Sequence, residues 1–415
     1  MPSSRRELVK GLLGVPLGAA AMAAISSEAA GSPEAGTAIT LPDKESFSFT
    51  DTFLNGAYAH PMCAQAYQGA EAFLNARVHD PAIAGPRSNP RNAAVKAFAG
   101  LINADPGEIA VVPSTMGGEN MICLALGLDR KTPVLTDGYH YDASLAMYGE
   151  LNARNGVPVS VVAPRDFRID LNDMDAQIKK GTRLVALSLV ASPNGYEHDL
   201  KAVCDLAHAK GALVYADIVQ AAGAIPIDVK QSGVDFACCG TYKWLMADFG
   251  VAFLYVRPDR LAQLKQVQIG WRSIKDDVRH VLPFDPPGRA MGDWKVGTDT
   301  ASRFEVGTPN WLALGAAASS IAYIQSIGVE NIVRYRQPLI DRLQSELPRR
   351  GFTAITPKSR GPIVAYAYQG LAAKFGPAIE KAKIKVTLSE NIMRVSPSVY
   401  NDMDDIEHLL DVLKS

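Results

Sequence analysis

The chain has little of what marks several common classes of protein. Its five cysteines, an odd number in 415 residues, include no CxxC pair, which argues against a disulfide framework and against a zinc site. Neither a GxGxxG nor a GKS/T motif occurs, so no common nucleotide-binding loop is indicated. The 42 basic and 43 acidic residues nearly balance, and a net charge of -1 gives no electrostatic case for binding nucleic acid.

The first thirty residues have the pattern of an export signal. Arg5 and Arg6 precede an apolar pair and Lys10, which is similar to a twin-arginine signal, and a weakly hydrophobic run covers residues 11–25. Ser27-Glu28-Ala29 then places small residues, Ser27 and Ala29, at the positions that a signal peptidase reads, so we expect cleavage near Ala29 or Ala30. The run is too short and too rich in Gly and Ala for a membrane anchor, which takes ~20 strongly apolar residues. We expect a periplasmic or otherwise exported mature protein; the alternative is a frayed N-terminal extension.

The rest of the chain predicts an α/β fold. Short apolar runs alternate with amphipathic stretches, and strands that are apolar throughout form a mostly parallel sheet covered on both faces when helices link them. Seven strands are expected at residues 109–113, 133–137, 159–163, 184–190, 213–217, 234–239 and 251–256. Helices are expected at about 118–128, 143–155, 172–180 and 199–210.

The flanking segments complete a division into four parts. Helical spacing covers residues 62–103, and residues 257–308 contain several prolines and glycines, which indicates a long irregular excursion. Two helices from about 310 to 348 then lead into a smaller α+β unit. The expected parts are a signal peptide (1–30), an N-terminal arm (31–60), a large domain (61–308), and a connecting helix with a small C-terminal domain (309–415).

Two residues at expected strand ends give the strongest indication of chemistry. Asp217 ends the run LVYAD, and Lys243 follows the run VDFACC. In open α/β sheets, ligands bind at the carboxyl ends of the strands. A lysine there can form a Schiff base with pyridoxal 5′-phosphate, while a carboxylate keeps the pyridine nitrogen protonated. Alone, Asp217 could be a helix cap and Lys243 a surface residue; together they predict a cofactor site, in which Gln220 can donate a hydrogen bond to a ring oxygen.

A polar turn follows the first expected strand. Ser114, Thr115 and Met116 precede two glycines, and the helical pattern ENMICLALGL begins directly afterwards. Free N–H groups and hydroxyls at the start of a helix bind phosphate, so this turn is a candidate phosphate cradle. The alternative is an ordinary capped turn.

Two further patterns are weaker. The segment DGYHYD at 137–142 follows the next strand, and one of its aromatic residues can stack on a cofactor ring, although three in a row cannot all be ligands. Arg303 and Arg394 are candidates for a bidentate grip on a substrate carboxylate. The simpler interpretation of either arginine is a surface ion pair.

In this order, the motifs YADIVQAAG, GTYKW, RFEVGTPN and RVSPSVYNDMDDIEHLLDVL resemble the class V aminotransferase family, which has fold type I of the pyridoxal-phosphate enzymes. The resemblance covers roughly residues 50 to 415. It is strongest to the isopenicillin N epimerase-like branch, which also contains exported members such as the periplasmic pyoverdine-modifying enzyme. It therefore implies a large domain with a mostly parallel seven-stranded sheet and a smaller C-terminal α+β domain.

The resemblance also implies roles for individual residues. Those at the cofactor would be Lys243 as the Schiff-base lysine, Asp217 at the pyridine nitrogen, Gln220 at the 3′-oxygen, Tyr141 on the ring, Tyr242 beside the lysine, and Ser114, Thr115 and Met116 at the phosphate. Arg394 would hold the substrate carboxylate. Thr308 would reach the phosphate in a neighbouring subunit, which implies a homodimer with shared active sites.

Departures from the family pattern narrow the chemistry. The family often has histidine where Tyr242 stands. Cysteine desulfurases need a nucleophilic thiol in the C-terminal domain, and no cysteine follows Cys239, so persulfide formation is not expected. Amino-group transfer at the α-carbon of an amino acid or amine-bearing metabolite is the leading expectation. Epimerisation comes second, C–S or β-lyase chemistry third, and a non-catalytic protein that binds the cofactor is the rival of a different class.

Overall fold

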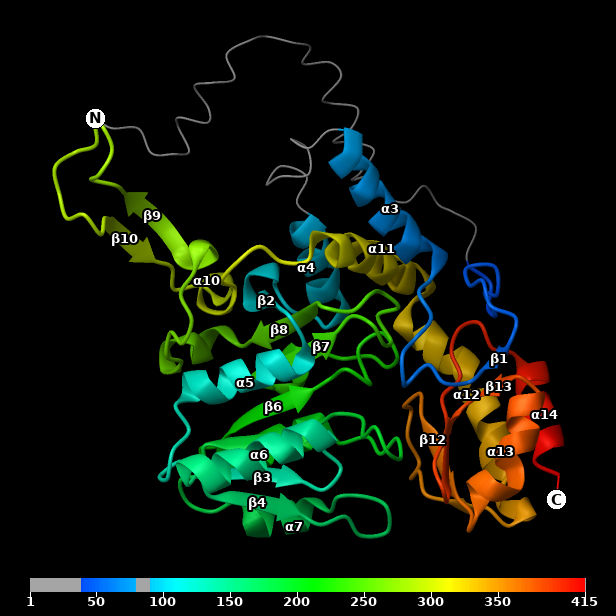
Figure 1. The fold of residues 1–415 in the computed structure, drawn as a ribbon. Coiled ribbons are helices and arrows are strands. Elements are labelled where there is room, and N and C mark those ends of the chain that lie inside the picture. Colours follow the sequence, from blue (N-terminus) through cyan, green and yellow to red (C-terminus); the bar gives the residue numbers. More distant parts are fainter. Residues whose placement is uncertain (1–38, 80–89, 415) are drawn as a thin grey trace.

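The computed structural model describes residues 39–79 and 90–414. A large α/β unit carries a smaller unit at its C-terminal side (Figure 1). The expected signal peptide, its cleavage site and the start of the arm lie outside the described residues. Among the described residues, no single helix is long and apolar enough to cross a membrane. One bent pair of helices, α11 (Trp311–Ile327) and the following α12 (Val329–Glu346), has the length and composition of a membrane span only when the two are taken together.

The centre of the large unit is a seven-stranded sheet in the order β2-β8-β7-β6-β5-β3-β4. Strand β8 is antiparallel to both of its neighbours, and the other four pairs are parallel. All seven expected strands and the mostly parallel arrangement are therefore confirmed. The strands are β2 (Ile109–Val112), β3 (Val134–Asp137), β4 (Val159–Val162), β5 (Leu184–Ser188), β6 (Leu213–Asp217), β7 (Phe236–Gly240) and β8 (Ala252–Val256).

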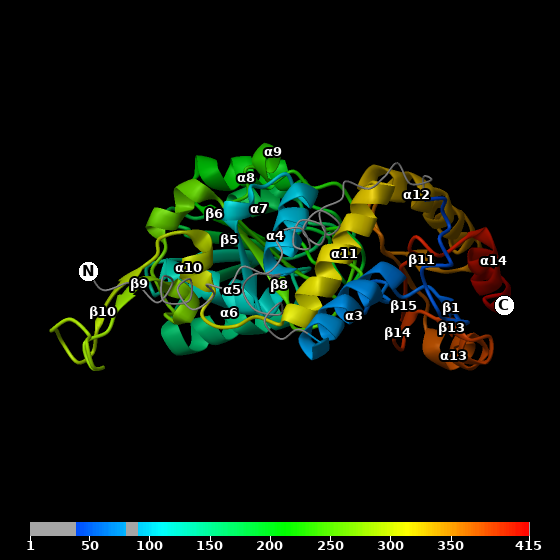
Figure 2. The same cartoon turned by 90° about the horizontal axis from the view of Figure 1, so that it is seen from above.

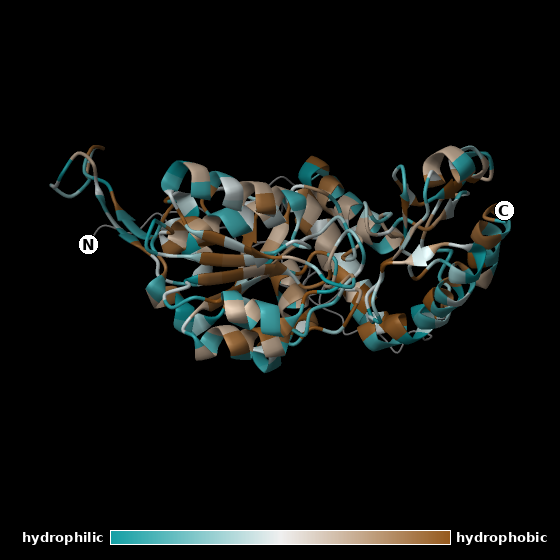
Figure 3. Cartoon of the chain, turned by 90° about the horizontal axis from the view of Figure 1, so that it is seen from below, coloured by the Kyte–Doolittle hydropathy of each residue, from teal (hydrophilic) through white to brown (hydrophobic). Residues whose placement is uncertain are grey.

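Helices cover both faces of this sheet, because its strands present apolar side chains to both sides. Leu184 and Ala186 belong to one hydrophobic cluster, and the alternate residues Val185 and Leu187 belong to the other. The helices are separated accordingly in Figure 2, and the apolar strands lie between them in Figure 3. One face packs against α4 (Pro90–Leu101), α7 (Leu171–Gln177), α8 (Leu200–Ala209), α9 (Val229–Ser232) and α11 (Trp311–Ile327), and the other against α5 (Thr115–Leu126), α6 (Asp142–Asn155) and α10 (Thr300–Phe304).

The smaller unit has its own core around a four-stranded antiparallel sheet. The sheet has the order β11-β12-β15-β14 and packs with helices α12, α13 and α14. The N-terminal segment joins this unit, since β1 pairs in parallel with β13 and Leu54 lies in its core. The elements are β1 (Thr52–Phe53), α12 (Val329–Glu346), β11 (Thr353–Ala354), β12 (Val364–Ala367), α13 (Leu371–Lys381), β13 (Ile384–Lys385), β14 (Thr387–Leu388), β15 (Ile392–Val395) and α14 (Met403–Val412).

Two expected segments differ from the structure. The helical stretch at 62–103 contains two helices, α3 (Ala64–His79) and α4, with residues 80–89 between them not described. The excursion at 257–308 is more regular than its prolines and glycines suggested. It contains a hairpin of β9 (Ile274–Val278) and β10 (Asp293–Val296), which projects from the large unit in Figure 1. Pro283, Pro286 and Pro287 fall in the turn between these strands, where no ladder hydrogen bond is needed.

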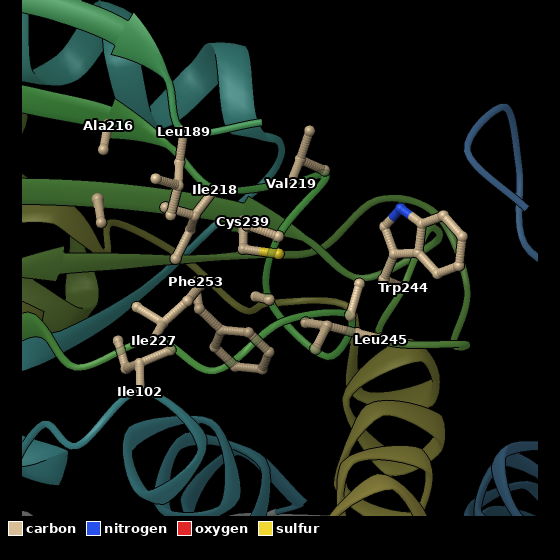
Figure 4. Packing of buried hydrophobic residues seen from close by; sticks show 14 of the residues in the cluster. Ile102, Leu189, Ala216, Ile218, Val219, Ile227, Cys239, Trp244, Leu245 and Phe253 are labelled. Atoms are coloured by element: carbon tan, nitrogen blue, oxygen red, sulfur yellow. The ribbon is translucent and has the colours of Figure 1, made fainter. Parts of the chain in front are cut away.

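The segments that follow Asp217 and Lys243 pack tightly on each other. Ile218, Cys239 and Trp244 belong to one buried cluster (Figure 4). Gly223 has φ +87°, and a Cβ there would clash with the carbonyl oxygen of Trp244. Gly223 is therefore required both by its backbone conformation and by the approach of the neighbouring segment.

We expect Gly223→Ala to lower the free energy of unfolding by at least about 2 kcal/mol, because a left-handed conformation and a backbone clash both oppose the added methyl group. The matched control is Gly181→Ala, since Gly181 has φ +86° but no atom within 4 Å of an added Cβ. It should lose only about 1 kcal/mol. Urea denaturation of the cofactor-free variants measures both values, and equal losses would contradict the claimed packing.

Candidate active site

The polar residues selected from the sequence gather at one edge of the large sheet. Strands β2, β3, β5, β6 and β7 run in the same direction, because β8 is antiparallel to both β2 and β7. Their carboxyl ends therefore meet at one edge, where ligands bind in open α/β sheets (Figure 1). Asp217 ends β6 and lies opposite Ser188, which ends β5. Lys243 follows three residues after the end of β7.

Asp217 is a buried carboxylate with few neighbouring groups that stabilise its negative charge. Its side chain is 4% exposed, and its Oδ1 accepts a hydrogen bond of 2.9 Å from the Val219 N–H. Burial raises the pKa of Asp217 to about 6, although the Val219 N–H and the nearby His140 oppose the rise. Within the described chain, Asp217 has no ion-pair partner. A cationic ligand group would remove the cost of this burial.

Lys243 is the second buried ionisable group at this edge. The residue is 8% exposed, and its Nζ lies 5.8 Å from the centre of the Tyr242 ring. Burial lowers the pKa of Lys243; the carboxylate of Asp217 opposes this and Arg394 adds to it. A lowered pKa makes the neutral, nucleophilic amine available nearer to neutral pH, which suits covalent attachment to an aldehyde.

Arg394 supplies the third buried charge, from strand β15 of the smaller unit. Its Nη1 donates to the carbonyl and hydroxyl oxygens of Ser192, both at 2.8 Å, and its Nη2 donates to Thr387 Oγ1 at 3.0 Å. Its Nε is buried without a hydrogen-bond partner, and burial lowers the pKa of the guanidinium. In the part of the chain that the structure covers, no carboxylate pairs with Arg394. An anion that pairs with this guanidinium would therefore have to come from outside the described residues.

Gln220 is fixed in place between the two units. Its Nε2 donates to the Ala57 carbonyl at 3.0 Å, and its Oε1 accepts a hydrogen bond of 2.8 Å from Trp244 Nε1. Its Nε2 also lies 3.4 Å from Ser192 Oγ, the hydroxyl that Arg394 contacts. The structure thus brings Gln220 to the site, while its expected contact with a cofactor oxygen stays a prediction.

The start of α5 has the form of an anion site. Ser114 is its N-cap and accepts from the Gly117 N–H at 2.9 Å, and Thr115 Oγ1 accepts from the Gly240 N–H at 2.9 Å. The hydroxyls are therefore used within the protein, whereas the first N–H groups of a helix have no partner inside it. A Cβ on Gly118 would lie 2.6 Å from Cys238 Sγ, so this glycine lets α5 pack on β7. Thr115 and Met116 can hold a phosphate through their backbone.

For three other expected residues, the structure gives a position but no contact that supports the expected role. Tyr141 is exposed at the N-cap of α6, and Tyr242 stacks on Phe249 with ring centres 4.7 Å apart. Thr308 is exposed in the loop before α11. Their roles at the ring, beside the lysine and in a neighbouring subunit stay predictions. The other candidate arginine, Arg303, donates to the Leu264 carbonyl at 2.6 Å, on the side of the fold where β8 and α10 pack.

The sequence analysis missed a buried ion pair at the same edge. His140 Nε2 lies 3.0 Å from Glu119 Oε1, and its Nδ1 lies 2.9 Å from the Ser188 hydroxyl. Tyr148 and Ser144 also donate to the Glu119 carboxylate. Burial opposes charge on both partners, but their attraction prevails and raises the pKa of His140 while it lowers that of Glu119. The available signal was a glutamate on an otherwise apolar helix stripe and a histidine in the segment at 137–142.

These groups fit pyridoxal phosphate. A buried amine, a buried carboxylate and the start of a helix would give partners to the aldehyde, the ring nitrogen and the phosphate, and a buried guanidinium would serve a substrate carboxylate. No group of three His, Cys, Asp or Glu side chains among the described residues could hold a metal ion.

Comparisons with known proteins point in the same direction. The family model described as aminotransferase class-V matches residues 88–409. An uncharacterized aminotransferase of Bacillus subtilis, YcbU, is 29% identical and the match covers 76% of this chain and 80% of that one. Isopenicillin N epimerase of Streptomyces clavuligerus is 27% identical, and the match covers 77% of this chain and 82% of that one. The apo structure of a cysteine desulfurase from Thermococcus onnurineus aligns with a TM-score of 0.80 at 22% identity. The alignment covers 90% of this chain and 98% of that one, so the two have the same fold.

We expect Asp217→Asn to stabilise the cofactor-free protein at pH 8. Burial raises the pKa of Asp217 from its usual 3.8 to about 6, so the folded state binds a proton more tightly than the unfolded state does. Stability is therefore lost as pH rises from about 4 to above 6, by roughly 3 kcal/mol, and asparagine removes that loss.

Urea denaturation at pH 8 and near pH 4 measures this effect. The free energy of unfolding that Asp217→Asn gains should shrink toward pH 4. The exposed control Asp277→Asn should show no such dependence on pH. A gain that did not change with pH would contradict the assignment.

Proposed function

The chain belongs to the class V aminotransferase family, and from this premise we propose that it transfers the amino group of an amino acid or amine-bearing metabolite. Membership makes it a pyridoxal-phosphate-dependent enzyme. The observation that carries the proposal is the meeting of Lys243, Asp217 and Arg394 at one sheet edge, all buried and, within the described chain, without ion-pair partners.

Each of these residues has a task that its surroundings explain. The bound cofactor supplies a ring that takes up electrons from the substrate α-carbon. Lys243 would hold the cofactor aldehyde and, once released, would take a proton from that carbon and return one, for which a lowered pKa is suited. Asp217 would be the negative partner of the ring nitrogen. Arg394 would bind the substrate carboxylate, and the start of α5 would bind the phosphate.

Epimerisation is the second candidate, because a relative at 27% identity is named isopenicillin N epimerase. The same residues serve both reactions. They differ in whether the amine leaves with the cofactor or the proton returns to the opposite face of the carbon. A product assay separates them, since transfer produces an oxo acid or aldehyde and epimerisation produces only the inverted substrate.

Persulfide-forming chemistry is not supported, although several similar folds belong to desulfurases. All five cysteines are buried. Burial raises the pKa of Cys63 to about 11 and that of Cys238 and Cys239 well above the usual value, so none is a ready thiolate.

Lys243→Ala tests the proposal. We expect it to abolish covalent retention of the cofactor after borohydride reduction, measured by mass spectrometry of the peptide that contains residue 243. Turnover of any amine should fall by on the order of 10²–10⁴-fold or more, because the general base is lost.

The control is Lys230→Ala, since Lys230 lies on the surface paired with Asp105 and should retain both properties. Near-normal turnover in the Lys243→Ala variant would refute the mechanism.

We further propose that the protein is exported through the twin-arginine route, as residues 4–10 suggest. Changing Arg5 and Arg6 to lysines should leave the full-length precursor inside the cell, which fractionation and immunoblotting detect. The same exchange at Arg349 and Arg350, an arginine pair in the folded part, should leave export unaffected. Unchanged export of the first variant would exclude this route.

A further inference from the structure

An open cavity of about 670 Å³ lies between the N-terminal segment and the edge of the smaller unit. Its walls include Phe49, Phe53, Asn55 and Tyr58 of the N-terminal segment and Val386 of the smaller unit. A volume of this size is within the range of ligand pockets, roughly 300–1,000 Å³. No motif in the sequence indicates a role for any of these residues.

Hydrogen bonds connect one wall of this cavity to the candidate active site. Thr387 Oγ1 donates to Asn55 Oδ1 at 2.7 Å, and the same hydroxyl accepts from Arg394 Nη2 at 3.0 Å. Only one side chain thus separates the cavity wall from the guanidinium that is expected to hold the substrate carboxylate.

The segment that forms this wall is fastened to the site along its length. The Ala57 carbonyl accepts from Gln220 Nε2 at 3.0 Å, and the His60 N–H donates to the Tyr242 carbonyl at 3.1 Å. The His60 ring in turn lies 2.6 Å, Nε2 to hydroxyl, from Ser398. The wall of the cavity is therefore held at a fixed position relative to Arg394.

The chemistry of the walls indicates what they would accept. Tyr58 is 69% exposed and Phe49 is 37% exposed, so aromatic surface faces the opening. The two charges on the wall, Asp51 and Lys385, pair with each other at 3.3 Å. With those charges neutralised, the cavity favours an uncharged group with a large apolar surface.

We propose that this cavity is the side-chain pocket of the active site and that the preferred substrates are amino acids with a large, uncharged aromatic side chain. The inference rests on the proposed function, because Arg394 must hold the substrate carboxylate for the side chain to point toward Asn55 and Tyr58. It names the substrate class that neither the fold nor the family specifies.

The first experiment compares kcat/KM for L-tryptophan and L-alanine in the cofactor-loaded protein. The native protein should favour tryptophan by at least about 100-fold. Tyr58→Ala should lose about tenfold on tryptophan and stay unchanged on alanine, because an aromatic contact is removed only for the larger substrate. Tyr67→Ala, at a tyrosine of similar exposure (60%) on α3, should match the native protein on both.

The second experiment measures the pocket without the reaction. Indole-3-propionate has the carboxylate and the aromatic ring but no amine, and calorimetry should show it binding the loaded protein more tightly than propionate, with the difference reduced in Tyr58→Ala. If no amine is turned over but this difference appears, the proposed function fails and the pocket stands. If amines are turned over with no preference for tryptophan over alanine, or if Tyr58→Ala and Tyr67→Ala behave alike, the pocket proposal is overturned.

Discussion

The burial of charge at one sheet edge is the constraint on which the rest of the structure depends. Asp217, Lys243 and Arg394 lie out of water, and none forms an ion pair with another described residue. Burial raises the pKa of Asp217 and lowers the pKa of Lys243 and of Arg394, so in each case it favours the neutral form of the side chain. Such an arrangement costs folding free energy, and it persists because the surrounding core holds the three side chains in place. A ligand that carries a cation and a carboxylate recovers much of that cost.

The packing around the edge explains how the positions are maintained. The close contact of Gly223 with Trp244 joins the segment after Asp217 to the segment after Lys243. Gln220 ties Trp244 to the backbone of the N-terminal segment, and Ser192 ties the large unit to Arg394. Two units with separate cores therefore present a single site, since the hydrogen bonds between them converge on a few fixed polar side chains.

The sheet and its helices could be predicted closely from the sequence, because apolar strands and amphipathic helices have local periods. Asp217 and Lys243 could be selected because each directly follows an apolar run. The pairing of His140 with Glu119 was not predicted, because Glu119 lies inside α5 and does not follow an apolar strand. The hairpin β9–β10 was also missed, because short polar strands have no periodic apolar signal.

By itself, the sequence determined the fold class, the order of the strands along the chain and the residue types that stand at their ends, because these follow from local patterns of hydrophobicity. Only the tertiary structure decided which of those residues meet, how deeply they are buried and where the cavity beside Asn55 opens. The reason is physical: pKa values and pocket shape depend on the distances between segments far apart in the chain. Residues 55 and 387 come together only when the N-terminal segment packs on the smaller unit.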